Sequence, residues 1–327
     1  MSEPRLITVL GASGLLGTAI VRELAQRPVR LRLASRNPPK VPEDRRAHVE
    51  TCTGDLTEPG AVARAVDGAD VVIHLVVHSV GESTWRVITE DNKAERVNVG
   101  LVHDVLEAIR KQRPEQPPVL LFAGSMSQLV RDPSAEEDVP ITIYDRHKDA
   151  AWQAIEQANE EGLVRGSSLQ LATLYSQGPD QGVEDRSVVA LMIRQALAGR
   201  PITMWFDGAP KRDLLCVDDA AKAFTAALDR IDRTAGRYWL IGRGEETTIG
   251  ELFTKISETV SEYTGSPPVP VVPVPAADYA VVTDRMDFVL DPGPFEEVTG
   301  WSSRVPLEQG LKGAVVTLAE SENGRGY

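Results

Sequence analysis

Two side chains that could move a proton lie four residues apart in the segment Ile141–Ile155, which reads ITIYDRHKDAAWQAI. The segment has a helical pattern, and positions i and i+4 share a helix face, so Tyr144 and Lys148 point the same way. A phenol beside an ammonium group can give a proton to an oxygen that gains negative charge. The same spacing also occurs on ordinary solvated helix faces. Whether Tyr144 and Lys148 take part in chemistry therefore has to be judged from the rest of the chain.

A glycine pattern near the N-terminus indicates a nucleotide site. The pattern G-x-x-G-x-x-G separates the apolar run Leu6–Leu10 from a helical pattern, which predicts strand, turn and helix. The N–H groups and the dipole at such a helix start favour a pyrophosphate, and glycines let it approach closely. A tight turn that needs glycine only for its geometry is the alternative. The residues expected to hold a dinucleotide here are Gly11, Ser13, Gly14, Leu15 and Gly17.

The end of the second predicted strand bears on which dinucleotide binds. An NAD site usually has an acidic residue there for the ribose 2′-hydroxyl, whereas this chain has Ser35 and Arg36. An acid would repel a 2′-phosphate, while an arginine can bind it with two hydrogen bonds. We therefore expect NADP(H). The alternative is that Arg36 is an ordinary surface residue. Asp55 and Leu56, in TGDLTEP, are expected at the adenine edge.

Apolar runs alternate with helical patterns along the first half of the chain. This alternation predicts an α/β fold, a Rossmann-type doubly wound parallel sheet with a smaller C-terminal substrate-binding domain. The expected division is 1–176 plus about 214–243 for the first domain, and about 177–213 plus 244–327 for the second. The main predicted elements are strands Val29–Ala34, Val71–Val77, Val119–Ser125 and Ser167–Tyr175, helix Glu95–Ile109, and a strand and helix in Leu214–Leu228. Prolines make Ser266–Pro275 an extended loop or edge segment.

Composition limits the classes of partner. The 327-residue chain has a formal net charge of −13, with 42% hydrophobic and 25% charged residues. Nucleic acid and anionic membranes need positive patches, so neither is expected as a partner. Two cysteines far apart, Cys52 and Cys216, favour a reduced compartment, and the N-terminus lacks a signal-peptide pattern. We expect a cytoplasmic protein with no membrane span.

The chain resembles the extended short-chain dehydrogenase/reductase family, in its NAD-dependent epimerase/dehydratase branch. The shared motifs run almost the whole length: GASGLLG, GDLT, VIHLV, RVNVG, FAGSMS, YDRHK, KRDLLCVDD and GWSSRVPLEQGL. A narrower similarity is to the dTDP-4-keto-6-deoxyhexose 4-ketoreductases of bacterial deoxysugar biosynthesis, including antibiotic biosynthesis. The narrower similarity is carried by FAGS, RVNVGL, ALAGRPITMWFDG and RYWLIGRG.

By this resemblance, Ser125, Tyr144 and Lys148 match the catalytic triad of the family. Hydride addition to a ketone creates an alkoxide, which needs a proton donor and a hydrogen bond as charge develops. Tyr144 would give the proton and Ser125 would bond the carbonyl oxygen. Lys148 would lower the pKa of the phenol and bond the nicotinamide ribose. Leu75 and Val76 are expected beside the cofactor as well.

The residues directly after Ser125 distinguish between reactions. Sugar-nucleotide 4,6-dehydratases have an Asp-Glu pair there to eliminate water, whereas this chain has Met126 and Ser127. Epimerases keep a tightly held NAD, whereas Arg36 favours the exchanging reductant NADP(H). We therefore expect an NADPH-dependent ketoreductase that acts on C4 of a dTDP-4-keto-6-deoxyhexose. The alternatives are a nucleotide-sugar epimerase, a reductase of non-nucleotide carbonyls, and an NADP-sensing binding protein that is not an enzyme.

The resemblance also suggests substrate contacts and an oligomer. Arg212 and Arg285 match positions that hold the nucleotide diphosphate, and ordinary ion pairs with neighbouring aspartates are the alternative. Further sugar contacts are expected at His78, Ser127 and Thr173, and Gln170 stands where relatives often have arginine. A homodimer through the helices that contain Glu95 and Tyr144 is suggested by the resemblance.

His74, His147 and metals are expected to have no part in the chemistry. His74 lies inside a buried strand and is predicted to be a hydrogen-bonded core residue. His147 is expected to face away from the site, although it lies between Tyr144 and Lys148. No cluster of residues has metal-ligand spacing, so no metal is expected.

Overall fold

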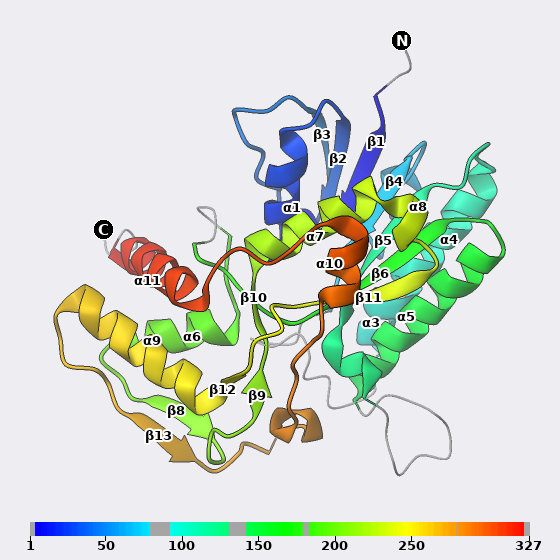
Figure 1. Ribbon diagram of the computed structural model, residues 1–327. Helices are drawn as coiled ribbons and strands as arrows, with labels where there is room; N and C mark the ends of the chain where they lie inside the picture. The colour runs from blue at the N-terminus through cyan, green and yellow to red at the C-terminus, as the bar shows by residue number, and fades with distance from the viewer. Residues whose placement is uncertain (1–3, 79–91, 131–141, 179–182, 279, 324–327) are drawn as a thin grey trace.

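The central element of the fold is one sheet of seven parallel strands (Figure 1). The computed structural model describes residues 4–78, 92–130, 142–178, 183–278 and 280–323. The strand order is β11-β6-β5-β4-β1-β2-β3, so the order reverses between β1 and β4. The strands are β1 Leu6–Leu10, β2 Arg30–Ser35, β3 His48–Thr53, β4 Val71–His74, β5 Val119–Ser125, β6 Arg165–Leu171 and β11 Arg237–Ile241. The predicted doubly wound α/β fold is confirmed, and ligands bind such sheets at the carboxyl ends beside the reversal.

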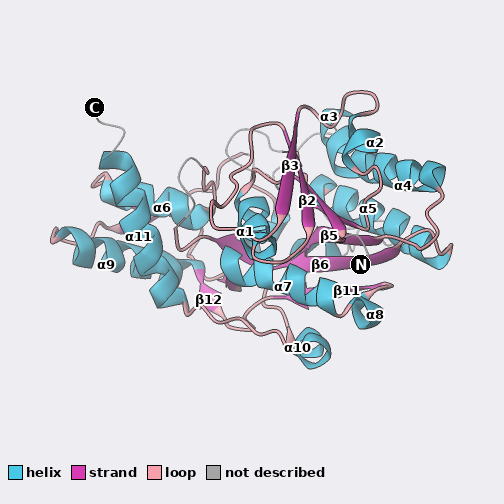
Figure 2. Ribbon diagram, turned by 90° about the horizontal axis from the view of Figure 1, so that it is seen from above, coloured by secondary structure: helices cyan, strands magenta, loops and turns pink. Residues whose placement is uncertain are grey.

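Helices cover both faces of this sheet, as Figure 2 shows from above. One face carries α1 Leu15–Ala25, α7 Val217–Asp229 and the short α8 Ile231–Thr234. The other face carries α2 Ala61–Ala65, α4 Leu101–Gln112 and α5 Ile143–Glu160. Strands β1 and β4 are fully buried along their length, as expected of parallel strands covered on both sides. Within the described residues, no helix combines the length and apolar composition that crossing a bilayer needs.

Two predicted elements differ from the observed ones. The helix expected at Glu95–Ile109 starts earlier, at α3 Asn92–Glu95, and continues through a π-helical turn, Arg96–Gly100, into α4. The strand expected at Ser167–Tyr175 is divided at Ala172. The Ala172 N–H still bonds the Ile241 carbonyl, at 2.9 Å, whereas the Thr173 N–H bonds the Asp213 carbonyl, at 3.1 Å. The chain leaves the large sheet because it changes its hydrogen-bonding partner.

A smaller lobe lies beside the carboxyl ends of the sheet (Figure 1). Its helices α6 Val188–Leu197, α9 Ile249–Thr264 and α11 Leu307–Asn323 share one apolar core. Short strand pairs complete it: β7 Thr173–Tyr175 with β10 Leu214–Cys216, β8 Ile202–Trp205 with β13 Val271–Val274, and β9 Lys211–Arg212 with β12 Thr247–Thr248. Strand β13 lies in the predicted proline-rich edge segment. The remaining described elements are the 3₁₀ turns η2 Met126–Leu129 and η3 Val282–Arg285, and helix α10 Gly293–Thr299.

The apolar cores do not divide at the predicted domain boundaries. Phe295 of α10 and Trp301 belong to the core beneath the large sheet, although both fall in the range expected for the second domain. Their rings are 5.6 Å apart, and the Phe295 ring lies 5.7 Å from that of Trp239 in β11. Conversely, Tyr175 packs in the core of the smaller lobe. The division of the chain into two domains stays a prediction.

Candidate active site

The glycine turn between β1 and α1 has the close contacts that only glycine allows. Gly11 has φ +90°, and a Cβ there would lie 3.2 Å from the Leu75 carbonyl carbon. A Cβ on Gly17 would lie 2.2 Å from the Gly11 carbonyl oxygen, so the first turn of α1 sits directly on the turn. Gly14 is the N-cap of α1, with extended backbone and no side-chain cap. Backbone N–H groups of this first turn, around Ser13 and Leu15, are therefore well placed for an anion.

The ends of β2 and β3 lie next to this turn. Ser35 is buried and donates its hydroxyl to the Asn37 carbonyl at 2.7 Å, while Arg36 is exposed. Asp55 accepts the N–H and the hydroxyl of Thr57, each at 2.8 Å. These bonds, with the charge of Arg36, hold the pKa of Asp55 below its usual value. Leu56 is buried beside it. Arg36 is thus exposed at a position where a 2′-phosphate could approach.

The segment after β4 lies against the glycines. The Leu75 N–H still bonds the Leu10 carbonyl at 2.9 Å, and the Val76 nitrogen would be 3.3 Å from a Cβ on Gly11. β4 itself ends at His74, three residues earlier than predicted. The His78 N–H then donates to the Asn98 side chain at 2.8 Å, which fixes the course of this segment. Ser79, the next residue, lies outside the described residues.

Ser125, Tyr144 and Lys148 come together at the carboxyl end of β5. The Tyr144 phenol lies near the Ser125 side chain, which acts to lower its pKa. The Lys148 ammonium lies 5.9 Å from the centre of the Tyr144 ring and 4.7 Å from that of Phe122, and it donates to the Ala123 carbonyl at 2.8 Å. A proton donor, a hydroxyl and a buried cation are therefore within reach of one small volume.

The electrostatics of this group differ from the expectation. Burial raises the pKa of Tyr144 well above its ordinary value, and the negative charge of Asp145 raises it further. The hydrogen bond with Ser125 acts in the opposite direction. The role expected of Lys148, to lower the pKa of this phenol, stays a prediction. Burial lowers the pKa of Lys148 itself to about 8.

The side chains of two expected substrate contacts, Ser127 and Arg212, already have partners within the protein. Ser127 donates its hydroxyl to Asp145 at 2.5 Å, so its assignment to the sugar is not what the geometry favours. Arg212 donates to main-chain carbonyls, among them Met286 at 2.5 Å and Thr283 at 3.1 Å. Thr173 is half-buried at the start of β7. The ion pair considered between Arg212 and Asp213 is absent, because Asp213 instead accepts main-chain N–H groups, including that of Gly244 at 3.0 Å.

Arg285 is the expected diphosphate contact that remains accessible. Its guanidinium lies 4.1 Å above the centre of the Phe206 ring. Phe206 has a φ of +58°, the left-handed region that L residues rarely adopt. The aromatic ring and the exposed cation thus lie against each other.

A family model for the NAD dependent epimerase/dehydratase family matches residues 7–242 of the chain. This range contains the glycine turn, Ser125, Tyr144 and Lys148.

The chain belongs to the NAD dependent epimerase/dehydratase family.

Curated relatives at low identity include two bacterial reductases. The chain is 28% identical over 221 residues to ceramide reductase of Caulobacter vibrioides, over 68% of this chain and 60% of that protein's length. It is 26% identical over 267 residues to 2-alkyl-3-oxoalkanoate reductase of Stenotrophomonas maltophilia, over 78% of this chain and 75% of that protein. Among solved structures, UDP-glucose 4-epimerase from Thermotoga maritima, with UDP-glucose, has a TM-score of 0.77 and 23% identity, and covers 97% of this chain and 99% of that one.

The sequence did not predict the buried position of Asp145 or the hydrogen bonding of His74 correctly. Asp145, 1% exposed, accepts the hydroxyls of Ser127 and Thr142, each at 2.5 Å. An acidic residue in the first turn of a helix ordinarily stabilises the helix through the helix dipole. The sequence therefore offered no reason to expect that Asp145 points inward. His74 is buried as predicted, but neither ring nitrogen has a hydrogen-bond partner in the described part of the chain. Burial lowers the pKa of His74 to about 3, so the ring is neutral.

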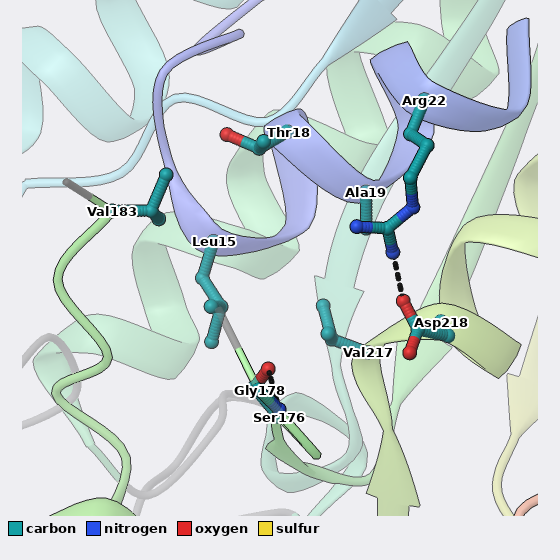
Figure 3. A pocket seen from close by; sticks show the side chains of 9 residues that line it. All are labelled: Leu15, Thr18, Ala19, Arg22, Ser176, Gly178, Val183, Val217 and Asp218. Atoms are coloured by element: carbon teal, nitrogen blue, oxygen red, sulfur yellow. Dashed lines mark hydrogen bonds and ion pairs between the residues drawn. The ribbon is translucent and has the colours of Figure 1, made fainter. Parts of the chain in front are cut away.

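A small cavity beside α1 contributes little volume to the site (Figure 3). Its volume is about 10 Å³, room for roughly one water molecule. An ion pair between Arg22 of α1 and Asp218 of α7 closes one side, and Gln177 donates to the same carboxylate at 2.7 Å. No three His, Cys, Asp or Glu side chains of the described residues gather to hold a metal ion. The prediction that no metal is used stays a prediction.

Proposed function

We propose that the protein is an NADPH-dependent ketoreductase that reduces the C4 keto group of a dTDP-4-keto-6-deoxyhexose. The observation that carries this proposal is the gathering of the Tyr144 phenol and the buried Lys148 ammonium near Ser125, at the carboxyl end of β5. A protonated phenol is the form that can act as an acid when an alkoxide develops. The residues after Ser125, Met126 and Ser127, lack the carboxylates with which a dehydratase eliminates water.

The chain's own residues fit a nicotinamide dinucleotide. Gly14 leaves the start of α1 open to a pyrophosphate, while Gly11 and Gly17 let the turn pack closely against Leu75 and α1. Exposed Arg36 suits a 2′-phosphate. When bound, NADPH would supply the hydride. Tyr144 would then protonate the alkoxide, and Ser125 would hydrogen-bond its oxygen. The Lys148 ammonium would hold the ribose once it turns from the Ala123 carbonyl.

A nucleotide-sugar substrate is supported by the position of Arg285 and by the fold. Arg285 is exposed and lies on Phe206, and a cation beside an aromatic ring suits a diphosphate and a base. The Thermotoga maritima structure of the same fold is described with UDP-glucose. The preference for dTDP over UDP belongs to the proposal, as do the cytoplasmic location and a homodimer through α4 and α5.

The test uses purified protein, NADPH and a dTDP-4-keto-6-deoxyhexose, with loss of nicotinamide absorbance as the readout. Tyr144→Phe should lower turnover by about 10²- to 10⁴-fold while cofactor affinity stays within about twofold. Oxidation of NADPH that continues undiminished in Tyr144→Phe would remove the proposed acid. Cofactor binding without turnover of any ketone would favour an NADP-sensing protein.

The second candidate is a reductase of non-nucleotide carbonyls. The names of two of the curated relatives, a ceramide reductase and a 2-alkyl-3-oxoalkanoate reductase, favour it. Binding of free dTDP separates the two functions, because a lipid-carbonyl reductase has no use for a nucleotide. Calorimetry that shows no dTDP binding, together with turnover of a long-chain 3-ketone, would favour the second candidate over the first.

A further inference from the structure

The carboxyl end of β5 has a neighbouring strand on one side only. Strand β4 ends at His74, whose partner in the sheet is Phe122. The next three residues of β5, Ala123, Gly124 and Ser125, pair with β6 but extend beyond the end of β4. A main-chain N–H group on the side without a strand needs an acceptor from elsewhere, because an unpaired N–H is costly to bury.

The side chain of Gln128 supplies such an acceptor. Its Oε1 accepts the main-chain N–H of Ser125 at 2.9 Å, and the Ser127 N–H donates to the Ser125 hydroxyl at 3.4 Å. The sequence Ser125-Met126-Ser127-Gln128 has the S-x-x-Q pattern of a capping box, in which two side chains satisfy main-chain N–H groups reciprocally. Since an N–H can only donate, the oxygen of the Gln128 amide must be the atom that faces Ser125.

Gln128 is deeply buried for a residue of a short turn. Its exposed fraction is 1%, and the turn η2 that contains it packs against both β5 and α5. A buried polar side chain is held by its hydrogen bonds, because breaking one leaves both the donor and the acceptor without a partner. The bond from Gln128 is therefore suited to keep Ser125 in one position.

The two residues before Ser125 are contacted in a similar way. Lys148 donates to the Ala123 carbonyl at 2.8 Å, and a Cβ on Gly124 would lie 2.0 Å from Oε1 of Gln170 in β6. Three successive residues of β5 thus meet side chains from three different elements. The contact of Lys148 ends when its ammonium turns to the ribose, whereas the bond from Gln128 to Ser125 does not depend on the cofactor.

We propose that Gln128 is a positioning residue that holds the Ser125 hydroxyl where it can bind the oxygen of the reacting ketone. The inference rests on the proposed reductase and adds a residue to its site. Negative charge grows on the ketone oxygen as hydride arrives, and a hydroxyl that already points there stabilises it best. Misplacement by about 1 Å can lower a rate about a hundredfold. Gln128 acts only through Ser125.

A double-mutant cycle tests whether Gln128 acts through Ser125. Gln128→Met keeps the size of the side chain without a strong acceptor, so kcat should fall about 10- to 100-fold while KM stays within about twofold. Ser125→Ala should lower kcat about 10²- to 10³-fold. The double variant should match Ser125→Ala within about twofold, because no hydroxyl is left to position. Effects that multiply in the double variant would overturn the proposal.

Matched variants separate positioning from a general loss of stability. Gln128→Glu keeps an oxygen acceptor and should hold kcat within about threefold of the wild type. Glu251→Met breaks the capping box of Thr248 and Glu251 at the start of α9, in the smaller lobe. It should lower the unfolding temperature but leave kcat unchanged. An equal loss of kcat in Glu251→Met and Gln128→Met would overturn the proposal. If Gln128→Met does not fold, Gln128→Asn, whose amide is one methylene too short, replaces it.

Hydrogen exchange of the Ser125 amide gives a readout that needs no substrate. In the free protein, this N–H should exchange at least about tenfold faster in Gln128→Met than in the wild type, and at the wild-type rate in Glu251→Met. If the wild type reduces no ketone but the exchange responds in this way, the proposed reductase fails and the bond from Gln128 to Ser125 stands. Unchanged exchange in Gln128→Met would overturn the role of Gln128 whatever the activity.

Discussion

Arg212 holds the main chain on both sides of Arg285. Its Nη1 donates to the Met286 carbonyl at 2.5 Å, and its Nη2 donates to the Asp284 carbonyl at 3.2 Å. The planar guanidinium suits this task, because it offers several donors in fixed directions. The two arginines expected to share a phosphate therefore have different positions: Arg212 fixes the turn η3, and Arg285 projects from it onto Phe206.

This arrangement predicts different effects for the two arginines. Arg212→Lys should lower the free energy of unfolding by about 2 kcal/mol, since one ammonium cannot satisfy the same carbonyls. It should also weaken dTDP binding. Arg285→Lys, the matched control, should change stability by less than about 1 kcal/mol and weaken dTDP binding about tenfold. Urea unfolding and calorimetry measure both quantities. An equal loss of stability in the two variants would contradict the division of roles.

Arg36 should determine the preference between the two nicotinamide dinucleotides. Arg36→Ala should weaken NADPH binding about tenfold or more and leave NADH within about twofold, because only NADPH carries the 2′-phosphate. Lys40→Ala, which removes an exposed charge four residues along, is the control and should weaken both equally. Fluorescence titration gives the dissociation constants. Equal weakening of both cofactors by Arg36→Ala would refute the phosphate contact.

Gly17 and Gly14 should respond differently to an added methyl group. A Cβ at Gly17 would lie 2.2 Å from the Gly11 carbonyl oxygen, whereas one at Gly14 would lie 3.4 Å from the same atom. Gly17→Ala should therefore cost about 1–3 kcal/mol of stability, as other overpacked sites do. Gly14→Ala should leave stability nearly unchanged but weaken cofactor binding at the start of α1. Thermal unfolding and cofactor titration test the pair, and a stable Gly17→Ala would count against the observed contact.

Stability should depend on pH through Lys148. Burial lowers the pKa of this ammonium to about 8, from an ordinary 10.5. Between those values the unfolded chain holds a proton that the folded chain has released, so the free energy of unfolding rises with pH. Tyr144, whose pKa is raised above 10.0, acts in the opposite sense only beyond pH 10. The raised pKa of Cys216 acts in the opposite sense above pH 9. The expected rise from pH 8 to 9 should therefore be lost in Lys148→Met and kept in Lys40→Met, as measured by urea unfolding.

Local pattern was sufficient where a segment is buried on both faces. The predicted strands Leu6–Leu10 and Val119–Ser125 have the observed bounds, because an unbroken apolar run in a parallel sheet leaves little choice of register. The division at Ala172 could not be predicted. It depends on carbonyl groups of Asp213 and Ile241, which are remote in the sequence and reach this strand only in the folded chain.

The candidate site shows the same limit. The i, i+4 spacing of Tyr144 and Lys148 placed both on one face, and the position of Ser125 at a strand end brought it to them. The inward turn of Asp145 and its bond to Ser127 depend on how α5 meets β5, which no local spacing encodes. Arg212 was expected to bind an anion, since a sequence cannot show that main-chain carbonyls already occupy its donors.

The return of α10 to the large sheet constrains the order in which the protein can be assembled on the ribosome. Phe295 and Trp301 close the apolar layer that Trp239 and the α7 helix begin. A nascent chain that has emerged only as far as the end of β11 would expose that layer to water. The dinucleotide half of the molecule should therefore acquire its full resistance to proteases only after residue 301 has left the exit tunnel.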